Sequence, residues 1–515
     1  MKLAEIGTVV SSLEGPSPAS FDFVVKDNGA KVRQGQFVEL ETDEGRLVGR
    51  IENVFKANRY FERAESVREY EKNKDMSSIF PVGRWEFTMA NVKPLGVCHD
   101  SNRNVMKPSF PPSPGAKVYV ADPEMLVRFL GIDKNGIDLG KIEHHDVEVK
   151  LNLTKLLQKH VAILAMSGAG KSYLTSVLLE ELLDRKKDQG RVGIVLIDVH
   201  GEYSSFAEPP KPGSGQADYS GKTTHINGAN FRIGLSNMSG EELSIYLTGI
   251  SPIQKRELNN VIDRFKKKMK KGEGTYTISD LIKEVEGDEK MSQKTKDSLN
   301  GWLYDLQKTN LFSDTDYPSI SSLVKPGQLS LLDLSGVLSN KKKQIIVSYL
   351  AKELFELRRA SRIPPFFFVI EEAHQFVPEG VKAERALAKS IIETIAREGR
   401  KFHAALCLIS QRPKRLSTTI LSQCNTHIIL RVTNPYDLDH IKQGSEGITE
   451  GALGAISTLP VGQGLIVGEA VNYPIFVKIR PRKSAESTKG NDLETAAKRY
   501  EEGKDKKEKD AESFL

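Results

Sequence analysis

The residues best suited to chemistry form a candidate phosphate-binding loop. The chain matches the pattern G-x-x-x-x-G-K-[ST] over residues 165–172, except that Ala165 stands at its first position. Small residues let successive backbone N–H groups turn toward phosphate oxygens, and the following helix directs its positive end at the same anion. Lys171 can reach the β and γ phosphates, and the Ser172 hydroxyl can complete the shell of a magnesium ion. The candidate nucleotide-binding residues are Ser167, Gly168, Ala169, Gly170, Lys171 and Ser172.

Two adjacent carboxylates follow an apolar strand later in the chain. Residues 366–370 are apolar throughout and lead into Glu371 and Glu372, and open α/β sheets bind ligands at the carboxyl ends of their strands. Phosphoryl transfer needs one carboxylate to hold magnesium and a second to orient the attacking water. We assign Glu371 to the metal and Glu372 to catalysis, although the strict pattern has aspartate at the first of these positions. The alternative is a pair of acids that caps a strand and opens a helix.

Three further polar residues flank the next apolar strand, 404–409. Gln411 follows this strand, where an amide can sense the γ-phosphate or hold the attacking water; the alternative is a turn that ends the strand. Arg397 and Arg400 lie at the end of the preceding helix. They could serve as structural charges at a helix C-terminus. They could equally project into the nucleotide site of a neighbouring subunit and neutralise charge in the transition state.

The segment Asp198-Val-His-Gly-Glu-Tyr203 follows the second predicted core strand. It places two acids and a histidine at the same edge of the sheet. His200 has no partner at the spacing of a metal site, and a structural turn explains the segment equally well.

The elements that must position these residues divide the chain by their sequence patterns. Short alternating runs separated by Gly and Pro predict a small antiparallel barrel at the N-terminus. From about residue 150, strands alternate with long helices, which predicts an α/β core with a parallel sheet. A polar, helix-rich stretch interrupts that core. The predicted parts are a barrel over 1–100, a connecting segment over 101–149, the first part of the core over 150–237, a helical insertion over 238–320, the second part of the core over 321–480 and a charged C-terminal tail over 481–515.

Composition narrows the class of protein. Of the 515 residues, 39% are hydrophobic and 28% charged, which is ordinary for a soluble globular protein. No apolar run approaches the roughly 18–20 residues that span a bilayer, and the N-terminus lacks a secretory apolar core. Three widely spaced cysteines suit a reducing compartment and exclude a zinc site made of cysteines alone. We therefore expect a cytoplasmic protein with no membrane partner.

Five motifs in this order resemble the HerA family of archaeal hexameric DNA translocases, in the FtsK–HerA branch of RecA-like motor ATPases. They are the phosphate loop, DVHGEY, FVIEEAHQF, REGRKF and LISQRP. The N-terminal segment resembles the small β-barrel domain of that family. The segments 462–468 and 474–478 are similar to its closing strand pair.

The resemblance implies a RecA-like P-loop core in a homohexameric ring that hydrolyses ATP with Mg²⁺ and moves double-stranded DNA through a central pore. It also implies a nuclease partner, NurA, and a double-strand-break processing complex, which together make 3′ overhangs by DNA end resection for homologous recombination. Carried onto this chain, Lys171, Ser172, Glu371 and Glu372 take the roles given above, and Arg397 and Arg400 match the basic positions of REGRKF. Lys159 occupies the place of the family's basic residue, usually arginine, before the loop-bearing strand. The resemblance also implies that Pro474 and Ile475 lie near the nucleotide base.

Two other functions are open to the same sequence: a conjugation or secretion ATPase that works at a membrane, and a ring scaffold in which ATP turnover is incidental. Glu372 and Gln411 argue against the scaffold, which needs neither. Candidate contacts for DNA phosphates are the runs Lys341–Lys343 and Lys266–Lys271, each of which could instead be a solvated helix face. No nuclease constellation lies outside the nucleotide site.

Overall fold

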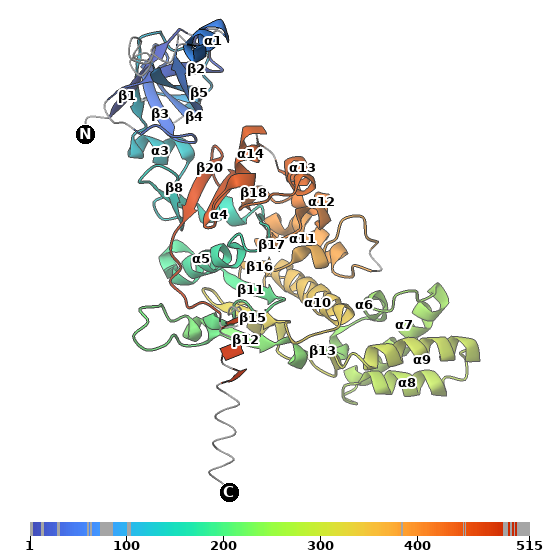
Figure 1. Ribbon diagram of the computed structural model, residues 1–515. Helices are drawn as coiled ribbons and strands as arrows, with labels where there is room; N and C mark the ends of the chain where they lie inside the picture. The colour runs from blue at the N-terminus through green and yellow to red at the C-terminus, as the bar shows by residue number, and fades with distance from the viewer. Residues whose placement is uncertain are drawn as a thin grey trace. The chain divides into compact units, whose positions relative to one another are not determined.

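The computed structural model folds into two compact units (Figure 1). The first contains Met1–Asn152, Gly447–Ala455 and Gln463–Arg480, and the second contains Leu153–Glu446, Ile456–Gly462 and Pro481–Leu515. None of the described helices is both long and apolar enough to cross a membrane. The structure describes residues 4–11, 15–27, 31–58, 61, 64–72, 86–99, 105–382, 385–445, 447–448, 450–487, 493–494, 497–498 and 500–501.

A closed antiparallel barrel forms the first part of unit one. Strands pair in the order β2-β1-β7-β3-β4-β5, β2 also pairs with β5, and β6 extends the sheet beyond β5. Side chains alternate across the barrel wall, so that Phe21 and Phe23 are buried on either side of the half-buried Asp22. The predicted N-terminal barrel is confirmed. The elements are β1 (Glu5–Val10), β2 (Phe21–Val25), β3 (Phe37–Thr42), β4 (Gly45–Asn58), α1 (Ala64–Lys72), β5 (Glu86–Cys98), β6 (Val105–Met106) and β7 (Lys117–Val120).

One barrel strand lies outside the predicted boundary. β7 falls in 101–149, where we expected a connecting segment, and it pairs with both β1 and β3. Val118 at its centre is fully buried in the barrel core. The barrel therefore needs a strand from beyond residue 100, where the sequence patterns predict that the domain ends.

The rest of unit one joins two distant parts of the chain. β20 pairs with β19 on one side and with β8 on the other, and β9 pairs with β8, all antiparallel. We predicted that residues up to 480 belong to the core, but this closing strand pair belongs to unit one, because Val477 lies opposite Ile142 in the ladder. The elements are α3 (Pro123–Leu130), β8 (Ile137–Ile142), β9 (Glu148–Leu151), β19 (Gln463–Gly468) and β20 (Ile475–Ile479).

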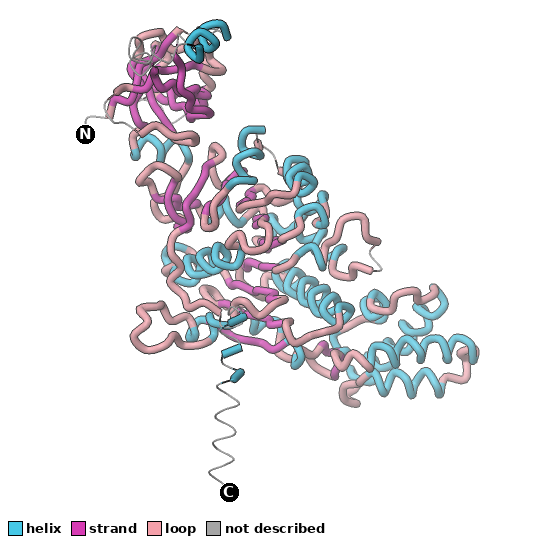
Figure 2. Tube along the Cα trace, in the orientation of Figure 1, coloured by secondary structure: helices cyan, strands magenta, loops and turns pink. Residues whose placement is uncertain are grey.

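A parallel sheet forms the centre of unit two (Figure 2). Among the described residues its strands follow the order β12-β15-β11-β16-β17-β10-β18, and all are parallel. The inner strands are buried along their whole length, which explains their unbroken apolar runs. The predicted α/β core is confirmed. The strands are β10 (Val161–Leu164), β11 (Gly193–Asp198), β12 (Thr223–Asn227), β15 (Leu329–Asp333), β16 (Phe366–Ile370), β17 (Ala404–Ser410) and β18 (Thr426–Ile429).

Helices connect these strands, as parallel pairing requires. The longest, α10, begins at the cap residue Ser339 and buries an apolar stripe that includes Ile345 and Leu354. The helices of unit two outside the insertion are α4 (Leu153–Leu157), α5 (Lys171–Asp184), α10 (Asn340–Arg359), α11 (Lys389–Phe402), α12 (Thr418–Leu421) and α13 (Pro435–Gly444). The residues of α14 (Glu450–Thr458) are divided between the two units.

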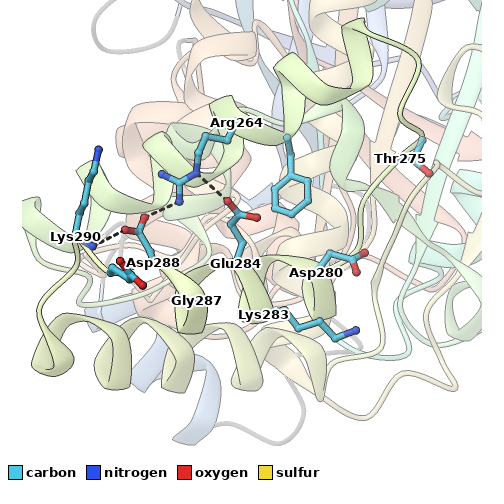
Figure 3. Close-up of a pocket in the computed structure, with 10 residues that line it drawn as sticks. Arg264, Thr275, Asp280, Lys283, Glu284, Gly287, Asp288 and Lys290 are labelled. Carbon is cyan, nitrogen blue, oxygen red and sulfur yellow. Dashed lines mark hydrogen bonds and ion pairs between the residues drawn. The ribbon is translucent and has the colours of Figure 1, made fainter.

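Four helices occupy the stretch predicted as an insertion. Ser239 and Ser251 cap the first two through capping boxes with Glu242 and Gln254. A hollow between α7 and α8 holds Arg264, whose guanidinium lies 3.0 Å from Glu284 and 2.7 Å from Asp288 (Figure 3). The elements are β13 (Ile233–Gly234), α6 (Gly240–Ile245), α7 (Pro252–Lys270), α8 (Ile278–Gly287), α9 (Gln293–Gln307) and β14 (Phe312–Ser313).

The start of the predicted tail is packed against α5. Glu180 on that helix is fully buried, and its Oε1 accepts hydrogen bonds from the N–H of Lys483 (2.9 Å) and from the N–H (2.8 Å) and hydroxyl (2.6 Å) of Ser484. Residues 481–487, which we call the strap, are therefore anchored to α5 at Glu180, because a buried carboxylate must have donors. Most of the predicted tail, 488–492, 495–496, 499 and 502–515, lies outside the described residues.

We expect Glu180→Ala to release the strap and to lower the free energy of unfolding by on the order of 3 kcal/mol, because buried donors lose a charged acceptor. Trypsin should then cleave at Arg482 or Lys483 in the folded protein. Glu181→Ala is the matched control. It removes a partly exposed ion pair with Lys483 (3.0 Å) and should cost no more than about 1 kcal/mol. Equal losses in the two variants would contradict the anchoring role of Glu180.

Candidate active site

The phosphate-binding loop follows β10, which lies between β17 and β18 in the sheet. Gly168 and Gly170 have φ of 75° and 97°, a left-handed conformation that glycine adopts without strain. Ala165 has no such conformation and lies fully buried, with its N–H donating to the Ser410 carbonyl at 3.2 Å. The departure from the pattern at position 165 therefore creates no strain. α5 begins at Lys171 and points its N-terminus into the loop.

Lys171 meets both predicted acids. Its Nζ donates a hydrogen bond to Oε1 of Glu372 and lies 3.8 Å from Oε1 of Glu371. The Lys171 side chain is 12% exposed, while Glu371 and Glu372 are 0% and 1% exposed. The fold thus brings together a cation and two carboxylates in a site that excludes most water, where electrostatic interactions are strong.

Glu372 is held in a strained conformation. Its φ and ψ of 49° and 43° lie in the left-handed region, which costs a residue other than glycine on the order of 1–3 kcal/mol. Its Oε2 makes no hydrogen bond among the described residues and lies 3.2 Å from Nδ1 of His374. One oxygen is therefore held by Lys171, and the other is a buried acceptor without a hydrogen-bond donor among the described residues.

Glu371 shares a buried pocket with Asp198. Its Oε2 accepts the N–H of Val199 at 3.0 Å, while Oε1 makes no hydrogen bond among the described residues. Burial, reinforced by the Asp198 carboxylate, raises the pKa of Glu371. Burial also raises the pKa of Asp198. We take Asp198 as the ionised member, because four backbone N–H groups favour its charge. They belong to His200 (3.2 Å), Gly201 (2.6 Å), Glu202 (3.1 Å) and Tyr203 (3.0 Å).

The side chains suit a magnesium ion. The Ser172 hydroxyl donates to Oε2 of Glu202, and the orphan Oε1 of Glu371 is a buried oxygen that lacks a donor. Mg²⁺ usually takes one or two protein oxygens and completes its octahedron with phosphates and water. Within the described ranges, no cluster of three or more His, Cys, Asp or Glu residues could hold a metal by itself. Ser172 and Glu371 therefore fit an ion that arrives with its nucleotide.

The other predicted catalytic residues lie directly after β17 and on α11. Gln411 is half-buried directly after β17. Arg397 and Arg400 are exposed on α11, where Arg397 pairs with Glu393 at 3.7 Å. Exposure is what a residue needs to reach a neighbouring subunit, but the roles of these three residues stay predictions.

The three remaining predicted nucleotide contacts fall on both units. The carbonyl of Lys159 accepts the N–H of Asn425 at 2.9 Å and so fixes the chain just before β10. Pro474 and Ile475 belong to unit one, where the Pro474 carbonyl accepts a hydrogen bond from Arg50 (3.5 Å) and Ile475 is 1% exposed. Their contact with the nucleotide stays a prediction.

Three site residues were not assigned a role from the sequence: Asp198, Glu202 and His374. The first two lie in the DVHGEY segment, whose acids we had noted without choosing between a site and a turn. The structure shows the turn, in which Asp198 accepts the N–H of Glu202 and Glu202 accepts the Ser172 hydroxyl. A functional role of these acids stays a prediction. His374 lay within FVIEEAHQF, and a lone histidine gave no signal of its contact with Glu372.

A buried histidine joins the elements that carry the site. His160, directly before β10, accepts the N–H of Leu406 in β17 at Nδ1 (3.0 Å). Its Nε2 lies 3.0 Å from the Ala396 carbonyl in α11. These contacts require the neutral tautomer with the proton on Nε2. Burial lowers the pKa of His160 to about 4. His160 thereby sets α11 against the strands that end in the phosphate loop and Gln411.

A parallel sheet with a glycine-lined phosphate loop, a lysine and paired acids on nearby strands defines a P-loop ATPase. The model of the family described as "Helicase HerA, central domain" matches residues 137–354. A probable helicase of Methanocaldococcus jannaschii is 30% identical over 476 residues, which cover 86% of each chain. The chain belongs to the HerA helicase family, and the resemblance predicted from its motifs is confirmed.

A second relative agrees with this assignment, and one solved structure shares the fold. The DNA double-strand break repair helicase HerA of Saccharolobus solfataricus is 29% identical over 470 residues, 87% of this chain and 88% of that one. VirB4 of Thermoanaerobacter pseudethanolicus superposes with a TM-score of 0.51 at 18% identity, covering 68% of this chain and 97% of that one. The second likeness shows a shared fold.

We expect the free energy of unfolding to fall as the pH drops from about 6.5 to about 4. The folded His160 resists protonation until about pH 4, whereas the unfolded residue binds a proton below its ordinary pKa of 6.5. Stability from neutral His160 is thus fully present above pH 6.5 and is lost toward pH 4, by about 3 kcal/mol. Urea unfolding at a series of pH values should show a shallower slope for His160→Gln. Substitution of the exposed His200 by Gln is the control, and an unchanged slope in His160→Gln would refute the assignment.

We expect Glu372→Gln to bind ATP but to hydrolyse it about 10²–10⁴-fold more slowly, the range for loss of a general base. The amide keeps the shape of the side chain and can still accept a hydrogen bond from Lys171. Nucleotide binding by fluorescence and phosphate release would be measured together. Glu398→Gln, which neutralises an exposed acid on α11, is the control. Full hydrolysis by Glu372→Gln would show that another group activates the water.

Proposed function

We propose that this chain is an ATP-driven double-stranded DNA translocase or helicase. The observation that carries the proposal is the cluster of Lys171, Ser172, Glu371 and Glu372 at the carboxyl edge of one parallel sheet. Relatives named as DNA double-strand break repair helicases, similar over most of the chain, support DNA as the substrate.

The geometry suggests how binding prepares the site for hydrolysis. The Lys171 ammonium donates a hydrogen bond to Glu372, and a triphosphate in the loop competes for the same ammonium. When Lys171 turns to the phosphates, Glu372 loses its charge partner and becomes a stronger acceptor for a proton of the attacking water. A bound Mg²⁺ would neutralise charge on the phosphates, and the Ser172 hydroxyl and Glu371 are placed to hold it.

We also propose a homohexameric ring that acts with the NurA nuclease, and with a double-strand-break processing complex, in DNA end resection for homologous recombination. The motif resemblance supports these partners, and the exposed Arg397 and Arg400 suit a site completed by a neighbouring subunit. A cytoplasmic location agrees with three buried free cysteines, Cys98, Cys407 and Cys424.

The test is ATP hydrolysis with and without linear double-stranded DNA at low and high salt. We expect stimulation by DNA that fades as salt rises, because phosphate contacts release counterions. Lys171→Ala should lower kcat by about 10²-fold or more in both conditions, while Lys187→Ala, at an exposed position after α5, should behave as wild type. Turnover that ignores DNA would contradict the proposed substrate, and hydrolysis by Lys171→Ala would contradict the proposed site.

A further inference from the structure

A hollow of about 930 Å³ opens where the segments after β15, β16 and β17 meet. Three separate stretches of chain line it: Leu338 to Lys343, His374 to Val381, and Lys414 with Arg415. The carboxyl ends of the strands in an open α/β sheet are where such folds bind ligands. Figure 1 shows α10, which carries Lys343, beside the strands β16 and β15. We call this feature the basic hollow.

Positive charge dominates the basic hollow. Lys343, Lys414 and Arg415 line it, and Lys341 and Lys342 precede Lys343 in the first turn of α10. Glu379 is the one carboxylate among the residues that line it. That carboxylate already accepts the N–H of Thr418 at 2.6 Å. The hollow therefore suits an anion.

The form of the hollow favours a polymer over a small anion. Arg415 and Lys414 are exposed, and Leu338 at the rim is 98% exposed. The Lys414 ammonium lies 4.2 Å from the centre of the Tyr436 ring, which holds its charge in place at the surface. Lysine and arginine side chains on separate loops are the usual contacts of a protein that grips nucleic acid by its backbone phosphates.

His374 connects the basic hollow to the catalytic carboxylate. It lines the hollow, and its Nδ1 lies 3.2 Å from Oε2 of Glu372 and 3.2 Å from Oγ of Ser410. The Glu372 oxygen that it approaches is the one with no hydrogen bond among the described residues. His374 is 11% exposed. A ligand in the hollow can therefore shift the histidine, and the histidine can shift the oxygen that orients water.

We propose that the basic hollow holds backbone phosphates of the DNA, and that His374 transmits their presence to Glu372. The inference rests on the proposed function and adds to it the residues that sense DNA. His374 is a positioning residue, since it acts through Glu372. Of the two lysine runs suggested by the sequence, the proposal selects Lys341–Lys343 and leaves Lys266–Lys271 as a solvated face of α7.

The first test measures binding of a fluorescent blunt duplex at several salt concentrations. The double variant Lys414→Ala/Arg415→Ala should lose affinity and should reduce the slope of log affinity against log salt by about 2, near 0.9 for each phosphate that is no longer neutralised. The matched control is Lys267→Ala/Lys270→Ala, which removes two exposed charges from α7 and should keep the wild-type slope. A slope unchanged in the first variant, or lowered in the control instead, would overturn the assignment of the hollow.

The second test separates binding from coupling. His374→Ala should bind the duplex with the wild-type salt slope, yet its stimulation by DNA should fall toward one-fold, through kcat and not through KM for ATP. His374→Asn, whose amide can replace Nδ1, should restore most of the stimulation. This rescue also excludes a general loss of folding. Full stimulation in His374→Ala would overturn the coupling.

The remaining outcomes distinguish this inference from the proposed function. Wild-type protein that neither binds nor responds to duplex would end both proposals. Wild-type protein that responds to duplex, while the hollow and His374 variants respond equally, would end only this one. Inorganic phosphate alone should not stimulate hydrolysis; stimulation equal to that by duplex would show that the hollow takes a free anion.

Discussion

The buried ammonium of Lys171 is the charge on which the rest of the site depends. It lies among carboxylates that are almost completely withdrawn from water, and carboxylates in such a place repel each other unless a cation or a proton intervenes. β17 lies between the strands that lead to Lys171 and to Glu372, so the lysine must reach across the end of that strand. Ser410, the last residue of this intervening strand, is fully buried.

The buried polar side chains of the surrounding framework have their hydrogen-bond partners in place. Four backbone N–H groups hold Asp198, His160 locks α11 to β17, and the strap satisfies Glu180 on the helix that begins with Lys171. Each of these groups is a buried polar side chain with its partners in place, which is the condition under which such groups rigidify a site instead of weakening it.

Much of the architecture could be predicted from local patterns. Apolar runs identified β16 and β17, because strands buried on both faces leave no room for polar residues. The boundaries failed where pairing partners are distant. β7 and the pair β19–β20 have ordinary strand patterns, and nothing local tells which sheet a strand joins. The charged residues of the strap predict an exposed tail. Its backbone N–H groups nevertheless donate to the buried Glu180, and the side-chain pattern does not indicate this contact.

The sequence by itself determined the kinds of chemistry: a phosphate loop, a lysine, paired acids, and the order in which they follow one another. The tertiary structure decided which of them share a site. The contact between Lys171 and Glu372 joins residues 201 positions apart, and the contacts of Glu202 and His374 depend on a turn and a strained residue that no spacing rule anticipates. Local sequence patterns predict which residues of a strand are buried. Which side chains come into contact depends on the order of the strands in the sheet, and that order is fixed only when all the strands pack together.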